Sequence, residues 1–69
     1  MATIQIVKNT KTGEFEVGLA SQALRRAMRA GGAPLSDIHA KAANDVCDYV
    51  TLQAREFGLT EPLSFQIAS

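Results

Sequence analysis

The chain has one cysteine and no long hydrophobic run, and its charges cancel. A single cysteine cannot form a disulfide within the chain, whereas a secreted domain of 69 residues would often carry several. No stretch reaches the roughly 18 consecutive apolar residues of a membrane span, and the amino-terminal segment lacks the apolar run of a signal peptide. We therefore expect a cytoplasmic protein that does not cross a membrane.

The absence of net charge also limits the possible partners. Seven basic and seven acidic side chains create no overall field that would attract nucleic acid or an anionic membrane, so such binding would need a local cluster. The hydrophobic share of 46% is typical of a globular protein, and the length predicts one domain over residues 1–69. A domain this small buries only about 60% of its unfolded surface, so self-association would stabilise it.

The side chains required for most catalytic and metal sites are also scarce. His39 and Cys47 are the only residues of their kinds and lie about 12 Å apart on one predicted helix, beyond the roughly 3 Å needed by a nucleophile and its base. Together they fall short of the about four nitrogen or sulfur ligands of zinc, and no EF-hand or phosphate-binding loop is present. We predict no enzyme activity, metal or cofactor. Cys47 is interpreted as a small buried residue and His39 as a packed neutral histidine, with a pH-sensitive interface contact as its alternative.

Three segments alternate apolar and polar side chains, which is typical of half-buried strands: residues 3–8, 14–19 and 63–68. The first two are joined by residues 9–13, which end in Gly13 and suit a hairpin loop. The pattern leaves open whether the last strand lies beside the first or the second. The predicted inner face of the sheet consists of Ile4, Ile6, Phe15, Val17, Leu19, Leu63, Phe65 and Ile67.

Two helices are predicted between the second and third strands. Ser21 is a suitable N-cap for a short helix through residue 30, which Gly31 and Gly32 would end. A longer helix is predicted over residues 36–57, with Gly58 as its left-handed terminator and Leu59 packing back on its last turn. The sequence thus predicts a two-layer α+β domain of order β-β-α-α-β, with a three-stranded sheet and both helices on one face.

The longer helix has an unusually wide apolar surface, with an arc of about 200° where a surface helix shows about 100°. We expect one edge, with Val46 and Tyr49, to lie on the sheet. The other edge forms a seam of small residues that the short helix, about 15 Å long against about 33 Å, would only half cover. The residues predicted to bind a partner are Ala43, Cys47, Val50 and Ala54. This favours a non-enzymatic protein-binding module, an adaptor or small inhibitor of phage or mobile-element type, that forms a homodimer.

The short helix carries the one notable charge cluster. Its basic side chains share an arc of about 100°, and no acidic residue lies in the same helix. Guanidinium groups bind phosphates well, although a solvated face near a helix carboxyl end is the simpler interpretation. The second hypothesis is therefore a nucleic-acid-binding regulator that uses Gln22, Arg25, Arg26 and Arg29.

Overall fold

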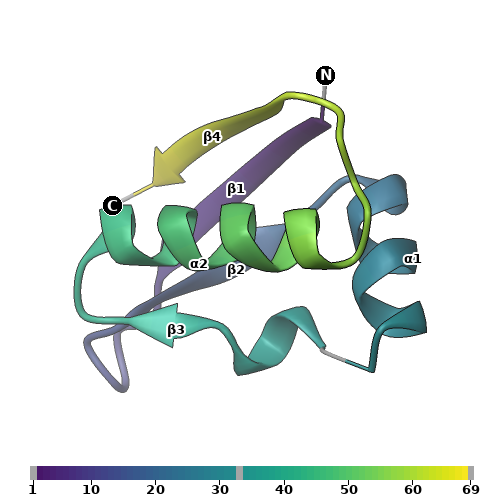
Figure 1. Cartoon of the computed structure of the whole chain (residues 1–69). Coiled ribbons are helices and arrows are strands. Elements are labelled where there is room, and N and C mark those ends of the chain that lie inside the picture. The colour runs from purple at the N-terminus through teal and green to yellow at the C-terminus, as the bar shows by residue number, and fades with distance from the viewer. Residues whose placement is uncertain (1, 33, 69) are drawn as a thin grey trace.

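The computed structural model describes residues 2–32 and 34–68. These residues form a mixed sheet with helices packed against it (Figure 1). The α+β class is confirmed, but the described residues form a sheet of four strands instead of the predicted three. The elements in chain order are β1 (Ala2–Lys8), β2 (Phe15–Leu19), α1 (Gln22–Ala30), the 3-10 turn η1 (Leu35–Asp37), β3 (His39–Ala40), α2 (Ala43–Glu56) and β4 (Leu63–Ala68).

The strand order is β3-β2-β1-β4. Strands β1 and β2 form the predicted antiparallel hairpin, whose loop is closed by hydrogen bonds from Asn9 N to Glu14 O and from Gly13 N to Asn9 O, both 2.8 Å. Strand β4 lies parallel to β1, which decides the order that the pattern left open. Ile4 pairs with Phe65 and Ile6 with Ile67, so the apolar residues of these two strands share one face.

An irregularity in β2 corrects the predicted inner face. Gln5 pairs with Leu19 but Ile6 pairs with Val17, so Gly18 is an extra residue without a partner. Such a bulge shifts the alternation by one residue and moves the following side chain to the opposite face. Leu19 consequently shares the face of Gln5 and is 63% exposed, so its predicted place in the core is wrong.

The α1 helix is close to its predicted bounds. The Ser21 hydroxyl accepts a hydrogen bond from the Leu24 backbone N–H at 3.1 Å, which confirms the N-cap. The helix ends at Gly31, and its buried side chains are Leu24 and Met28. A Cβ built on Gly31 would overlap the Phe57 ring, so glycine is required here by the close approach of α1 to the end of α2.

The predicted long helix begins seven residues late. Residues 36–42 do not continue α2: Leu35–Asp37 form the 3-10 turn and His39–Ala40 form β3, which pairs with Glu16 and Phe15 of β2. Ile38 has extended backbone angles but is still buried. Alanine favours helix, so the pairing of residues 39–40 with the free edge of β2 outweighs the local helix preference of Ala40 and Ala42.

The predicted end of α2 at Gly58 and Leu59 is confirmed. Gly58 has φ +83° and donates to Arg55 O at 3.1 Å, and Leu59 donates to Ala54 O at 2.9 Å. These two hydrogen bonds define a Schellman motif, which requires a residue in the left-handed region. Leu59 packs against the core, as expected.

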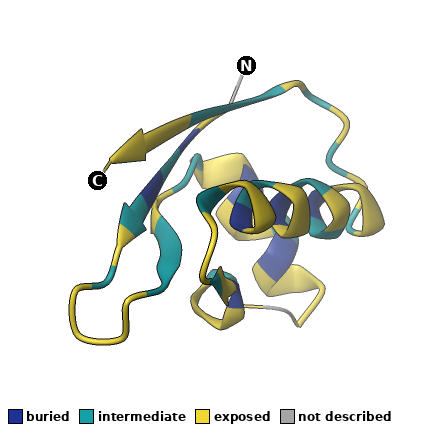
Figure 2. Ribbon diagram, turned by 90° about the vertical axis from the view of Figure 1, so that its left-hand side faces the viewer, coloured by how far each residue is buried: buried dark blue, intermediate teal, exposed yellow. Residues whose placement is uncertain are grey.

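The helices occupy different positions relative to the sheet. The α2 helix contacts all four strands, whereas α1 stands beside the carboxyl end of α2 (Figure 1). The predicted layout of two helices lying together on the sheet therefore needs this correction. Figure 2 shows the buried residues concentrated where α1, α2 and the sheet meet. They are Ile4, Ile6, Leu24, Met28, Ile38, Val46, Val50 and Ala54.

Candidate functional site

The seam predicted to bind a partner faces the core of its own chain. Val50 is 0% exposed and Ala54 is 2% exposed, while Ala43 and Cys47 are half-buried against the core. The wide apolar arc does not show which edge the sheet will cover, and the sheet covers this one. Val50 and Ala54 are therefore part of the core, whereas Ala43 and Cys47 keep some exposed surface.

The opposite edge of α2 is exposed instead. Tyr49 and Leu52 are 50% and 57% exposed, and three residues apart they are neighbours on the helix surface. Carboxylates one turn away border them on both sides. We call this surface the α2 outer patch; it consists of Asp45, Asp48, Tyr49, Leu52 and Glu56, all exposed.

Sequence reasoning assigned Tyr49 to the sheet and therefore missed this patch. The available signal was the position of the charges. Asp45 and Glu56 lie on the same side of the helix as Tyr49, and carboxylates are rarely buried without a partner. This side therefore had to face solvent, with Tyr49 beside it.

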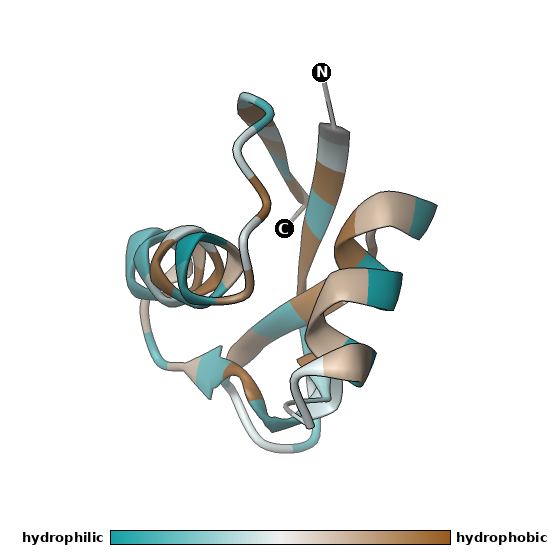
Figure 3. Ribbon diagram, turned by 45° about the vertical axis from the view of Figure 1, so that its right-hand side comes forward, coloured by the Kyte–Doolittle hydropathy of each residue, from teal (hydrophilic) through white to brown (hydrophobic). Residues whose placement is uncertain are grey.

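The basic residues of α1 do form one surface. Their side chains are exposed, opposite the buried Leu24 and Met28, and no acidic residue lies in α1. Figure 3 shows the hydrophilic (teal) residues of α1 on the side of the helix that faces away from the sheet. The four predicted residues line a single depression of about 260 Å³: Gln22, Arg25, Arg26 and Arg29. We call this surface the α1 basic face.

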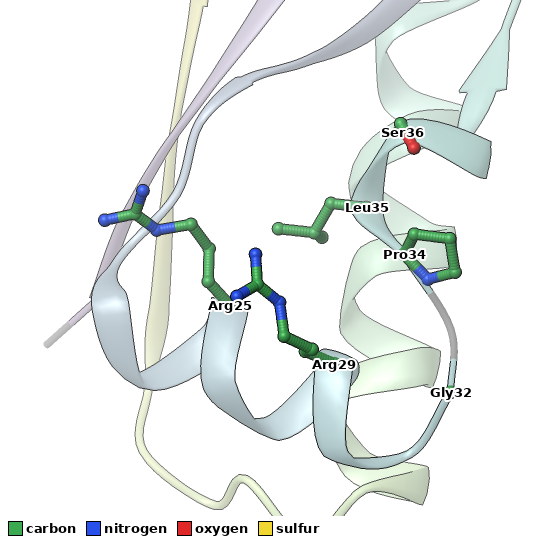
Figure 4. Close-up of a pocket in the computed structure, with 6 residues that line it drawn as sticks. All are labelled: Arg25, Arg29, Gly32, Pro34, Leu35 and Ser36. Carbon is green, nitrogen blue, oxygen red and sulfur yellow. The ribbon is translucent and has the colours of Figure 1, made fainter.

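A second hollow of about 390 Å³ separates α1 from the 3-10 turn (Figure 4). Leu35 extends toward α1 and the Arg29 guanidinium lies across from it, whereas the Arg25 guanidinium points away from the turn. Arg25 and Arg29 border both hollows. The remaining lining residues are Gly32, Pro34, Leu35 and Ser36.

His39 and Cys47 lie on different elements and in different surroundings. His39 is exposed on β3, and its Nδ1 lies 3.1 Å from Oε2 of Glu14, so the predicted packed histidine is wrong. His39 lies outside the core because residues 39–40 pair with the edge strand β2 instead of forming part of the helix. Burial, together with the negative charge of Asp48, raises the pKa of the free Cys47 thiol. The thiol therefore stays protonated near neutral pH, which makes it a weak nucleophile.

Metal-ligand clusters and membrane-spanning helices are both absent from the part of the chain that the structure describes. In residues 2–32 and 34–68, no three His, Cys, Asp or Glu side chains are grouped so that they could hold a metal ion. No helix within these residues combines the length and apolar character needed to cross a bilayer. Comparison with protein-family models, curated proteins and solved structures finds no match.

Proposed function

We propose that this protein is a cytoplasmic, non-enzymatic protein-binding module, an adaptor or small inhibitor of phage or mobile-element type, that acts through a helix face as a homodimer. The observation that supports it best is the exposure of Tyr49 and Leu52 side by side on α2. Large apolar side chains grouped on a surface mark interaction sites, and tyrosine is enriched among residues that dominate binding energy.

The α2 outer patch has the rigidity that a binding surface needs. Val46, Val50 and Ala54 hold the opposite side of the helix in the core, so little backbone entropy is lost on binding. Burying the part of Leu52 that is still exposed, 57%, would contribute about 1–2 kcal/mol. The neighbouring Asp45, Asp48 and Glu56 favour a partner that has an apolar pocket with a basic rim.

The protein-binding function predicts that Y49A/L52A loses its partner while staying folded. Extract of the native cell is passed over immobilised wild type, Y49A/L52A and the control L19A, which removes an equally exposed leucine from the outer face of the sheet. A protein held by wild type and L19A should bind Y49A/L52A at least about tenfold more weakly, since each truncated anchor costs about 1 kcal/mol or more. Equal retention by Y49A/L52A, or the absence of any protein that wild type and L19A retain and Y49A/L52A does not, would contradict the proposal.

Nucleic-acid binding through the α1 basic face is the second candidate. It is supported by the single depression that Gln22, Arg25, Arg26 and Arg29 line without an acidic neighbour in the helix. Guanidinium groups bind phosphates with two hydrogen bonds each and release counterions when they do so.

This candidate predicts a salt-dependent gel shift that R29A weakens. The charge-matched control is R55A, which removes an exposed arginine from α2. Between about 50 and 200 mM salt, wild-type affinity should fall steeply, and R29A should reduce the slope of log K against log salt by about 1. Absence of any shift at low salt, or equal effects of R29A and R55A, would reject this function.

A further inference from the structure

The exposed side of β4 lacks the features that normally protect a sheet edge. β4 is the last strand in the order β3-β2-β1-β4 and pairs with β1 along its whole length, from Ala2–Leu63 to Val7–Ala68, without a register shift. Its sequence, LSFQIA, contains no charge and no proline. Edge strands are usually short, bulged, charged or interrupted by proline, as the two-residue β3 is short at the opposite edge. A row of backbone N–H and C=O groups is therefore left available on β4.

A second observation at this edge is the exposure of the apolar residue Ile67. It shares the inner face of the sheet with its β1 neighbour Ile6, which is fully buried, yet Ile67 is 51% exposed. Figure 2 shows the carboxyl end of β4 extending away from both helices. An apolar side chain on the core side of the sheet is thus left without cover beside the open edge.

We propose that β4 pairs antiparallel with β4 of a second copy about a two-fold axis at Phe65, which joins the two sheets into one of eight strands. This inference rests on the homodimer proposed above and assigns its interface. A closed two-fold dimer pairs the β4 edge of both copies and leaves only the short β3 strands at the ends of the joined sheet.

The β4 strand is self-complementary in this register. Leu63 lies opposite Ile67 of the second copy, and Phe65 lies opposite its own counterpart. Directly opposite residues in an antiparallel pair share a face, so these apolar contacts all form on the inner side. On the outer side Ser64 lies opposite Gln66 of the second copy, and the uncharged strands do not repel each other. The pairing covers both Ile67 side chains.

A neighbouring register satisfies the strand less well. With the axis at Gln66, Phe65 would lie opposite Ile67 and the two Gln66 side chains would face each other, so Leu63 would have no apolar partner on the second strand. The axis at Phe65 is the arrangement that pairs all three inner-face residues of β4 with apolar residues.

The test compares wild type with S64K/Q66K and S64K/Q66E by light scattering across a concentration series. Both positions lie on the outer face beside Thr3 and Gln5 of β1, with Ser64 half-buried and Gln66 exposed, so a long charged side chain at either position can reach solvent. Wild type should reach twice its 7.4 kDa chain mass. S64K/Q66K places like charges opposite each other and should raise the dimer dissociation constant at least about tenfold. S64K/Q66E places opposite charges there and should restore the dimer.

Each failure has a distinct meaning. A monomeric wild type at the highest concentration overturns the homodimer itself. A dimer that S64K/Q66K leaves intact overturns the β4 interface but not the homodimer. Equal weakening of the dimer in S64K/Q66K and S64K/Q66E overturns the axis at Phe65. Amide hydrogen exchange of the wild type needs no variant: protection in β4 should increase with protein concentration while that in β3 stays constant, and an unchanged β4 contradicts the proposal.

Discussion

Replacing Val50 by glutamate is expected to unfold most of the protein. Val50 is fully buried among core residues that, in the described part of the chain, are all apolar. V50E therefore loses about 1.5–3 kcal/mol of apolar burial and places a carboxylate among apolar side chains. Removal of such a charge from water costs several kcal/mol more. A domain of this size has only about 3–10 kcal/mol of stability, at 0.05–0.15 kcal/mol per residue.

The matched control for V50E is L52E, on the same helix but on its exposed side. Circular dichroism and urea titration should show wild-type-like folding for L52E, with a change within about 1 kcal/mol, and mostly unfolded protein for V50E. A V50E variant as stable as L52E would mean that α2 does not turn this side toward the sheet. The pair therefore decides which edge of the wide apolar arc belongs to the core.

Replacing Gly31 by alanine is expected to destabilise the protein by about 1–3 kcal/mol, although alanine is usually tolerated near helix ends. The φ of Gly31 is −80°, which any residue adopts, so the effect comes from space and not from backbone strain. The new Cβ would overlap the Phe57 ring, which has to turn away from α1 or push the helix outward.

A double-mutant cycle with F57A isolates this contact. F57A alone is destabilising, but G31A should cost less than about 0.5 kcal/mol in the F57A background, because the obstructing ring is absent. The control is G32A, whose φ of +78° penalises alanine by about 1–2 kcal/mol while its surroundings are open, so its cost should be equal in both backgrounds. Additive effects of G31A and F57A in urea titrations would contradict the packing of α1 on Phe57.

Local signals explain the parts of the fold that could be predicted. Ser21 caps α1 with its own side chain, and Gly58 with Leu59 ends α2 through hydrogen bonds to residues within one turn. The hairpin loop ending at Gly13 is likewise closed by contacts between near neighbours. The α1 basic face was predictable for the same reason, since helical spacing alone places its residues on one side.

The features that were missed depend on residues distant in sequence. Strand β3 forms because residues 39–40 pair with the free edge of β2. This pairing places His39 in the sheet and not in the predicted helix. The outward turn of Leu19 follows from the bulge at Gly18, which places a glycine where a Cβ would lie 2.8 Å from Cγ1 of Val7. Neither contact leaves a periodic signal in the chain.

The sequence by itself determined the types of β1, β2, α1, α2 and β4, most of their ends and the concentration of basic residues on α1. Propensity, capping and periodicity act within a few residues, which is why these features were predictable. Only the tertiary structure decided that β4 lies beside β1 as an open edge, and that α2 buries Val50 while exposing Tyr49 and Leu52. An apolar arc wider than one contact surface permits several orientations of equal local energy. The choice among them is made by the apolar area that the sheet and α1 remove from water when they pack together.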